Sequence, residues 1–412
     1  MKSSEPLTRR TFIGTAGLVA AGLSASGMKI KKTGHVVMSP SELFGTVSPE
    51  DVGLHRDVES NMTSYLQSQI DAGVIPGAFV AASRNGKVFL ETHLGTYCNR
   101  TAREAPYDGR AMHPVHSISK TVSATVIAMA WQDGLIEIDV PLMKYIPEFG
   151  CEGKETITIR QLMSHSAGIP KNPMTPMDAT TEDGWNACVE AICKMPVEWE
   201  PGSRSHYHAL TAMLISAEAV RRASGRKSWN QICRERLFAP LGIASFTFEQ
   251  PPADLPLACI PRLKNPTTDW QNQLNHFYGH PAAGLKGIPA DFLKFLKFHT
   301  NKGTWNGKTL LEEKYWTSLH SIQFPDEPEF ENWGLGMMIR GNTSRKASLD
   351  WFGLGLVDRP NIFTHAGTSV ALAAGDPDSD IQVFFIVTDN PSNEKTVEIR
   401  NTVLATIFDA LT

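Results

Sequence analysis

The tetrapeptide Ser117-Ile118-Ser119-Lys120 opens a run, residues 121–131, that is apolar or small on every side and ends at Asp133-Gly134. A helix without a polar face must be buried, so this run predicts a helix in the interior of the fold. Ser117 would lie at the positive N-terminal end of that helix, and Lys120 would lie one turn later on the same face. The rest of the chain must therefore cover this helix.

A serine with a lysine three residues later can carry nucleophilic catalysis. A serine hydroxyl needs a base that takes its proton, and a desolvated lysine can have its pKa lowered far enough to serve. The same spacing recurs at Ser26, Ser224 and Ser392 without such a helix behind it. The local residues leave two interpretations open: a nucleophile with its base, or a capping serine before a surface lysine.

Two hairpins are predicted near the ends of the chain. Strand-like runs at 78–83 and 87–94 flank Asn85-Gly86, which is a strong hairpin signal. Runs at 370–374 and 381–388 form a second pair around a turn of their own. We expect both hairpins to share one antiparallel sheet.

An amphipathic helix flanks each hairpin, one from Val58 to Ile70 and one from Ile399 to Leu411. With both helices on one face of the sheet, the middle of the chain must be a mostly helical insertion. We therefore expect a mixed α/β fold with a cleft at the seam. The sheet part would comprise about 49–115 and 285–412, and the helical part about 116–284.

Other segments carry polar residues beside buried elements. They are Pro201-Gly202-Ser203-Arg204-Ser205-His206-Tyr207-His208-Ala209, Thr364-His365-Ala366-Gly367-Thr368, Thr158 to Ile169, Leu237 to Ile243 and Trp333-Gly334-Leu335-Gly336. Together with Ser117 and Lys120, they resemble the serine β-lactamase and penicillin-binding protein superfamily, and more closely its class C β-lactamase and family VIII esterase branch. The resemblance spans roughly Val52 to Leu411. It implies a β-lactamase/transpeptidase-like fold and a serine hydrolase that works through an acyl-enzyme.

The resemblance also implies roles for single residues. Ser117 would be the acylated nucleophile, Lys120 its proton partner, and Tyr207 the second-motif tyrosine that shares the base role. A phenol held beside a lysine ammonium can be drawn toward phenolate and pass protons at neutral pH. Without the other motifs, Tyr207 would read as a core tyrosine after a Pro-Gly turn.

The third motif of the family, Lys-Thr-Gly, is replaced here by His365-Ala366-Gly367. By resemblance, Gly367 would let the substrate approach the strand, and the amides of Ser117 and Thr368 would form the oxyanion hole.

Two departures from the family pattern bear on the substrate. Ala209 stands where penicillin-active members usually have an asparagine, and His365 replaces a fixed positive charge by a side chain that is mostly neutral at pH 7. Both changes weaken recognition of a lactam, so a carboxylic ester, or else a small amide, becomes the expected substrate. A β-lactamase or D-amino-acid peptidase is the alternative, and a catalytically silent binding protein is a third possibility, against which the intact Ser117, Lys120 and Tyr207 argue.

Metal or cofactor chemistry is not expected. His206 and His208 form a His-x-His pair, but the other histidines lie apart without the spacing of metal ligands. His165 sits in a predicted turn and reads as a hydrogen-bonding structural residue.

The composition is that of a folded globular protein and argues against a nucleic-acid-binding protein and a disulfide scaffold. The 412 residues are 42% hydrophobic and 20% charged, which is ordinary globular usage. A net charge of −4 and scattered Lys and Arg argue against nucleic-acid binding. Six cysteines, with no Cys-x-x-Cys pair, are too few for a disulfide scaffold.

The first residues resemble an export signal. Arg9-Arg10-Thr11-Phe12-Ile13 precedes an uncharged Ala/Gly-rich run of about 15 residues, shorter than the roughly 20 that span a membrane. We expect a twin-arginine signal at 1–27, a linker at 28–48 and the catalytic unit at 49–412. The protein would then work in the periplasm or outside the cell, and would meet a membrane only through an uncleaved signal.

Overall fold

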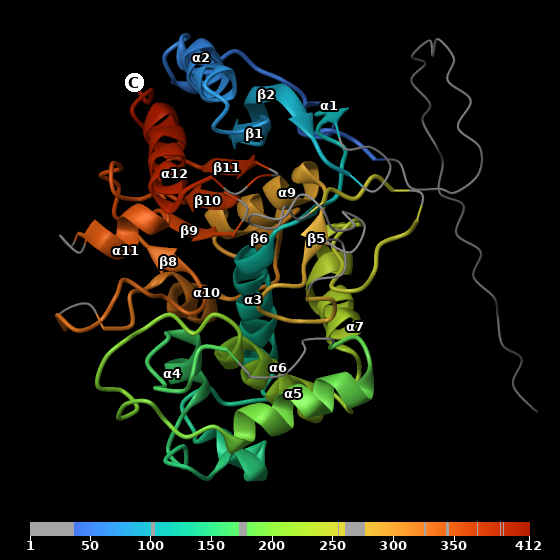
Figure 1. The fold of residues 1–412 in the computed structure, drawn as a ribbon, viewed down its shortest axis with the longest axis vertical. Helices are drawn as coiled ribbons and strands as arrows, with labels where there is room; N and C mark the ends of the chain where they lie inside the picture. The colour runs from blue at the N-terminus through green and yellow to red at the C-terminus, as the bar shows by residue number, and fades with distance from the viewer. Residues whose placement is uncertain are drawn as a thin grey trace, which may run out of the picture. The chain divides into compact units, whose positions relative to one another are not determined.

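The computed structural model joins the two ends of the chain in one antiparallel sheet of seven strands, in the order β3-β2-β1-β11-β10-β9-β8 (Figure 1). It describes residues 37–99, 104–172, 179–253, 255–259, 277–324, 327–342, 346–368, 370–387, 389 and 391–412, apart from the side chains of 346 and 347. The strands of this sheet are β1 (Gly77–Arg84), β2 (Lys87–Tyr97), β3 (Ala105–Pro106), β8 (Met338–Ile339), β9 (Phe363–Ala366), β10 (Leu372–Asp376) and β11 (Ile381–Ile386).

The two predicted hairpins are confirmed. Asn85 and Gly86 both have positive φ, at 53° and 75°, as the tight turn between β1 and β2 requires. β1 also pairs with β11, with Phe79 opposite Ile386. The first and last strands of the chain are therefore neighbours at the centre of the sheet.

Alternate residues of the central strands face two different cores. In β1, Ala78, Val80 and Ala82 belong to a cluster that includes the inward residues of the first and last long helices. Phe79 and Ala81 belong to the larger cluster on the other face. The period of two along the strand thus separates two hydrophobic layers.

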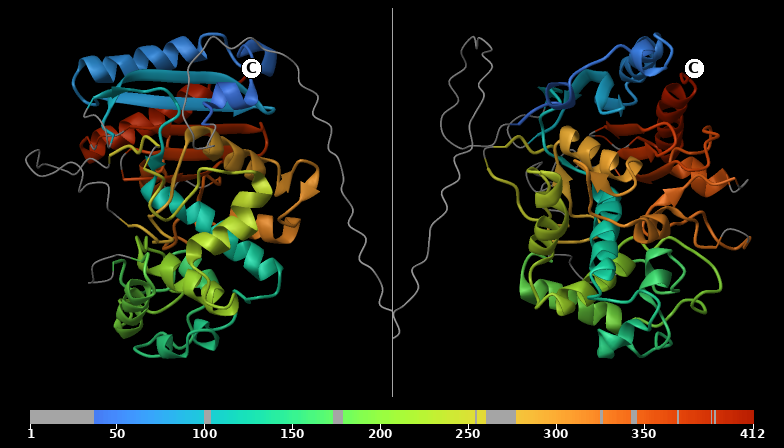
Figure 2. Two further views of the ribbon diagram at one scale, coloured as in Figure 1. Left: turned by 90° about the vertical axis from the view of Figure 1, so that its right-hand side faces the viewer. Right: turned by 180° about the vertical axis from the view of Figure 1, so that it is seen from behind.

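Helices cover both faces of the sheet (Figure 2). The long helices α2 (Val58–Asp71) and α12 (Asn393–Phe408) pack together on one face, as predicted. On the other face lies α9 (Pro289–Thr300), where the Phe292 ring stacks on Phe384 of β11 at a centroid distance of 4.5 Å. Besides α3, the other α-helices among the described residues are α1 (Pro40–Phe44), α4 (Ile159–Met163), α5 (Glu182–Lys194), α6 (Thr211–Ala223), α7 (Trp229–Cys233), α8 (Ala239–Leu241), α10 (Glu313–His320) and α11 (Lys346–Trp351).

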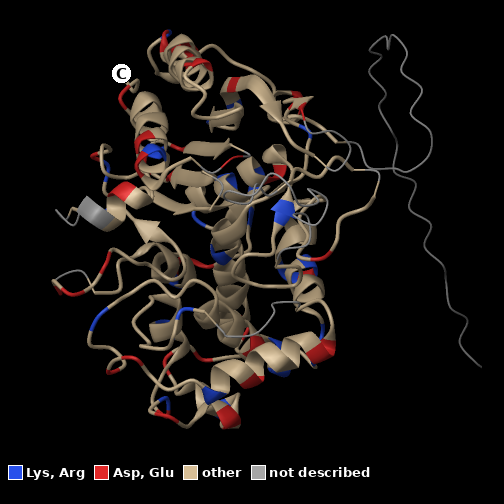
Figure 3. Ribbon diagram, viewed as in Figure 1, with Lys and Arg blue, Asp and Glu red and all other residues tan. Residues whose placement is uncertain are grey.

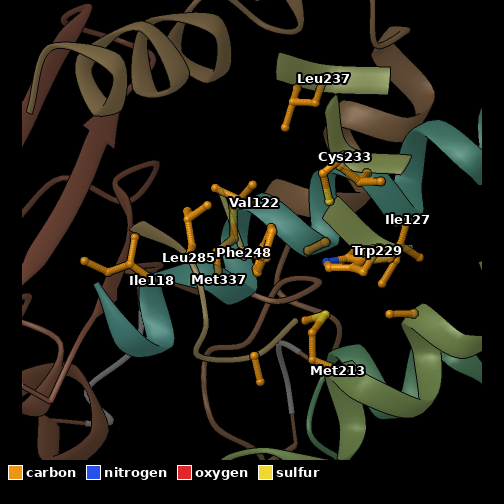
Figure 4. Packing of buried hydrophobic residues seen from close by; sticks show 14 of the residues in the cluster. Ile118, Val122, Ile127, Met213, Trp229, Cys233, Leu237, Phe248, Leu285 and Met337 are labelled. Carbon is orange, nitrogen blue, oxygen red and sulfur yellow. The ribbon is translucent and has the colours of Figure 1, made fainter. Parts of the chain in front are cut away.

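The predicted interior helix is α3 (Ser119–Gln132), and all its residues except the last are buried. Figure 4 shows Ile118, Val122 and Ile127 of this segment among side chains of other elements, including Met213 of α6 and Trp229 of α7. Because every side of α3 is covered, its first turn is held rigidly.

Two short strands lie at the ends of the predicted helical part. β4 (His113–Pro114) pairs with β5 (Lys286–Gly287), so the chain leaves toward α3 and returns after the helical stretch at the same place. Ser117 follows β4 by three residues. The seam between sheet and helices is therefore where the candidate nucleophile lies.

The N-terminal predictions need one correction. Residues 37–48 are not the linker expected for 28–48, because they contain α1 and its capping box between Ser39 and Glu42. The Ser41 amide also donates to the Glu91 carboxylate of β2 at 2.6 Å, which fastens this segment to the sheet. The expected signal at 1–27 lies outside the described residues.

Lys and Arg are scattered over the molecule rather than gathered in one place, and so are Asp and Glu (Figure 3). Over the part of the chain that the structure describes, no helix combines the length and the apolar character needed to cross a membrane.

Candidate active site

Ser117 lies in a single 3-10 turn, His116–Ile118, between β4 and α3. The Oγ of Ser117 is 3.1 Å from the Nζ of Lys120, so the two side chains predicted to work together are within hydrogen-bond distance. Ser117 is half-buried, whereas Lys120 is completely buried. The alternative of a capping serine followed by a surface lysine is therefore wrong.

The surroundings of Lys120 favour its neutral amine. Burial lowers the pKa of Lys120 well below its ordinary value. Its Nζ donates a hydrogen bond of 3.0 Å to the carbonyl oxygen of Ala282, and the contact with Ser117 is a donation from Nζ to Oγ. A neutral amine still has a lone pair that can take the Ser117 proton when the hydroxyl hydrogen turns toward Nζ.

The neighbouring serine, Ser119, has a structural role. Its Oγ accepts a hydrogen bond of 3.0 Å from the backbone amide of Leu285, and the side chain is fully buried. Ser119 therefore holds the returning chain against α3, and only Ser117 of this pair is open to a substrate.

Tyr207 lies beside this pair. The Nζ of Lys120 is 5.0 Å from the centroid of the Tyr207 ring. That ring stacks on Trp333, with centroids 5.5 Å apart and an interplanar angle of 12°. The second motif thus lies beside the candidate nucleophile and its base.

The surroundings of Tyr207 do not favour the phenolate character expected from the sequence. Burial raises the pKa of Tyr207, and the Ser117 hydroxyl and the Arg400 guanidinium only partly oppose this effect. A phenolate would need the positive charge of a Lys120 ammonium nearby. Burial disfavours that ammonium as well, so this stabilisation is reduced. These surroundings favour the phenol form of Tyr207, which can donate a proton.

His165 positions the second motif. Its Nδ1 accepts a hydrogen bond of 3.2 Å from the backbone amide of His208, and its carbonyl accepts one of 2.9 Å from the amide of His206. The ring also meets Trp333 edge to face at 4.3 Å. This agrees with the structural role expected from the sequence.

The third motif is pressed against the turn that carries Ser117. Gly367 follows β9, and a Cβ atom at this position would lie 2.5 Å from the carbonyl oxygen of Val115. Only glycine allows such a close approach of two backbones. The Gly367 carbonyl in turn accepts a hydrogen bond from the buried guanidinium of Arg400 in α12.

His365 enters the site as a neutral acceptor. Its ring is fully buried, and burial, with a smaller effect of Lys120, lowers the pKa of His365 well below the usual range. Nδ1 lies 2.9 Å from the carbonyl oxygen of Ala366, so we assign the ring proton to Nδ1. Nε2 then presents a lone pair, and among the described residues no hydrogen-bond partner meets it. Next along the chain after Gly367, Thr368 is exposed.

Sequence analysis missed several groups that build the site: the Ala282 carbonyl, the Trp333 ring and the Arg400 guanidinium. Trp333 belongs to a segment that carries the family resemblance, but the sequence does not predict its contact with Tyr207. Arg400 carried no signal, because a lone arginine in an amphipathic helix reads as a surface residue.

The histidines of the second motif are separated by their surroundings. His206 is exposed and faces Trp199, whereas His208 is buried and stacks on the same indole at 5.7 Å. Within the described residues, no group of three His, Cys, Asp or Glu side chains is placed to hold a metal ion.

Comparison with known proteins places this site in a family. A family model described as Beta-lactamase matches residues 62–406. Esterase/beta-lactamase LipL of Mycobacterium tuberculosis is 33% identical over 152 residues, which are 37% of this chain and 34% of that protein. A putative D-alanyl-D-alanine carboxypeptidase of Salmonella agona is 22% identical over 81% of this chain and 83% of its own length.

A solved structure has the same fold. The crystal structure of a family VIII carboxylesterase superposes with a TM-score of 0.67 at 19% identity, over 85% of this chain and 99% of the esterase. The α/β architecture expected from the motifs is therefore confirmed.

Proposed function

This chain belongs to the Beta-lactamase family and is a serine hydrolase, and we propose that it hydrolyses uncharged carboxylic esters through an acyl-enzyme on Ser117. The observation that carries the proposal is the 3.1 Å contact between Ser117 Oγ and the buried Nζ of Lys120. A serine hydroxyl beside a buried, neutral lysine is an activated nucleophile, because the amine can take its proton.

Acylation follows from this geometry. Lys120 takes the proton of Ser117 as Oγ attacks the ester carbonyl, and the resulting ammonium keeps its hydrogen bond to Ala282. We assign the amides of Ser117 and Thr368 to the oxyanion that forms. The alcohol leaves with a proton from Lys120, directly or through the Tyr207 phenol, and water then attacks the acyl-enzyme by the reverse route.

The third motif supports an ester rather than a lactam. A β-lactam carries a carboxylate, and His365 offers that group a lone pair on Nε2 instead of a positive charge. A hydrogen bond to a charged group is worth about 1.5–3 kcal/mol, so its loss would cost roughly 10- to 100-fold in acylation. The family VIII carboxylesterase agrees with this choice by its name, whereas LipL is named for both esterase and β-lactamase activity.

A D-amino-acid peptidase is the second candidate, because the Salmonella relative named as a carboxypeptidase matches most of the chain. The test is a substrate panel of p-nitrophenyl butyrate, penicillin G and a D-alanyl-D-alanine peptide, with Ser117→Ala as control. We expect kcat/KM for the ester to exceed that for the other two by about 100-fold or more. Faster turnover of penicillin or of the peptide would contradict the ester proposal.

We further propose that the protein is exported through the twin-arginine route. The proposal rests on Arg9-Arg10 before Thr-Phe-Ile and the short apolar run that follows. Replacing both arginines by lysine should leave the enzyme inside the cell, as measured by activity in cell fractions. Unchanged export of this variant would contradict the route.

A further inference from the structure

The end of β2 and the segment 255–259 place two cysteines opposite each other. Asn99 forms an antiparallel bridge with Ala258, and the Cys259 amide donates to the Cys98 carbonyl at 2.8 Å. This register makes Cys98 and Cys259 a directly opposed, hydrogen-bonded pair. Such pairs have Cα atoms about 5.5 Å apart and side chains on one face, within the range that a disulfide spans.

No disulfide joins the two side chains in this structure, and both are thiols. A hydrogen bond between them and the burial of Cys259 both raise the pKa of the Cys259 thiol. Cys98 is half-exposed, whereas Cys259 is only 2% exposed. An oxidant in solution therefore meets Cys98 first.

We propose that Cys98 and Cys259 form a reversible disulfide when the protein meets a low-molecular-weight disulfide, RSSR. The Cys98 thiolate attacks RSSR, forms a mixed disulfide and releases one RS⁻. The Cys259 thiolate then attacks the Cys98 sulfur and releases a second RS⁻. The two cysteine protons end on two RSH molecules, so the protein is oxidised by two electrons and RSSR is reduced by two.

This bond would fix segment 255–259, which pairs with the chain just before the Ser117 turn. The Met112 amide donates to the Pro256 carbonyl, and the Ala258 amide donates to the Met112 carbonyl, each at 2.8 Å. Met112 leads through β4 directly to Ser117. A link from segment 255–259 to β2 would close a loop that contains α3 and the second motif, and long loops gain most from closure.

A second pair of neighbouring cysteines provides a control within the same chain. Cys151 donates from Sγ to the carbonyl of Cys193 at 3.2 Å, so its thiol is directed at the backbone of its neighbour. Cys193 lies in the helix α5, so these two cysteines are not opposed on paired strands as Cys98 and Cys259 are. We expect this pair to stay reduced under the same treatment.

The test uses the purified, reduced full chain with oxidised glutathione, followed by alkylation of the remaining thiols and peptide mapping without reductant. We expect a linked pair of peptides that contain Cys98 and Cys259, loss of two hydrogen atoms from the protein, and reversal by dithiothreitol. The Tm of the oxidised form should exceed that of the reduced form by about 5 °C.

The variant Cys151→Ser should form the same bond, whereas Cys98→Ser should gain neither the link nor the shift in Tm. Glutathione left on Cys98 with Cys259 still alkylated would overturn the proposal. So would a link between Cys151 and Cys193, a dimer joined through Cys98, or six alkylated thiols. Because the map is read on the wild-type protein, poor folding of a variant leaves the result decisive.

Discussion

Lys120 and His365 are both fully buried titratable side chains at the site, but the fold treats them differently. Lys120 lies at the start of the interior helix α3 and contacts both Ser117 and the Ala282 carbonyl. His365 lies on β9, with one nitrogen bound to its neighbour's carbonyl and the other left as an acceptor. The first turn of α3 thus holds the reaction chemistry, and β9 offers no positive charge to a substrate. Catalysis and substrate choice can therefore be changed separately.

The largest effect is expected from Lys120→Met, because Ser117 loses its base. We expect kcat/KM for p-nitrophenyl butyrate to fall by about 10³-fold or more. The unfolded chain binds the Lys120 proton more tightly than the folded protein does, so this lysine's contribution to stability rises with pH up to its ordinary pKa.

At pH 7 the variant should accordingly unfold at the same or a higher denaturant concentration. A loss of activity that came with a loss of stability would point to misfolding instead of a missing base.

Gly367→Ala tests the contact between the two regions. The new Cβ would lie 2.5 Å from the Val115 carbonyl, so β9 must move away from the Ser117 turn. A displacement of about 1 Å costs around 100-fold in rate, and we expect kcat to fall by that amount. Wild-type kcat in a stably folded Gly367→Ala protein would show that the close packing is not needed.

The pH profile of activity distinguishes ionisation of Lys120 from ionisation of His365. Acylation needs the neutral amine of Lys120, whose pKa is lowered by burial, so activity should rise with pH through that pKa. Below it, kcat/KM should increase about tenfold per pH unit. Burial lowers the pKa of the His365 imidazole as well, and His365 does not contact Ser117 in the proposed proton transfer, so we expect His365→Gln to keep the same profile. A shift of the profile in His365→Gln would assign the ionisation to the histidine.

The smallest effect is expected from His365→Lys, which restores a positive charge on β9. The new charge can bind the carboxylate of penicillin G, so the ratio of penicillin G to p-nitrophenyl butyrate turnover should rise. We expect a rise of only about three- to tenfold, because burial disfavours the charged form of the new lysine. Adding Ala209→Asn should increase the ratio further. An unchanged ratio in both variants would mean that neither position sets specificity.

Sequence predicted most of the fold because its signals are local. Asn85-Gly86 sets a hairpin through two positive φ values, and the apolar run after Lys120 can only be a buried helix. Ser117 and Lys120 are one turn apart, so their contact was predictable as well.

The rest depends on contacts between distant residues. Ala282 lies 162 residues after Lys120 and takes part through a backbone carbonyl, which no residue type reveals. Trp333 and Arg400 reach the site only once the sheet and α12 are in place. The prediction of a linker at 28–48 is wrong in part, because the capping box in Ser39-Pro40-Ser41-Glu42 begins a helix there.

The central claim is that Ser117 is the acylated nucleophile, and a fluorophosphonate probe tests it directly. The labelled protein is digested and the modified residue is located by mass spectrometry, with Lys120→Met as the variant that should react far more slowly. The account predicts one adduct, on Ser117, and loss of ester hydrolysis in proportion to labelling. An adduct on Ser119, or full labelling with ester hydrolysis intact, would contradict it.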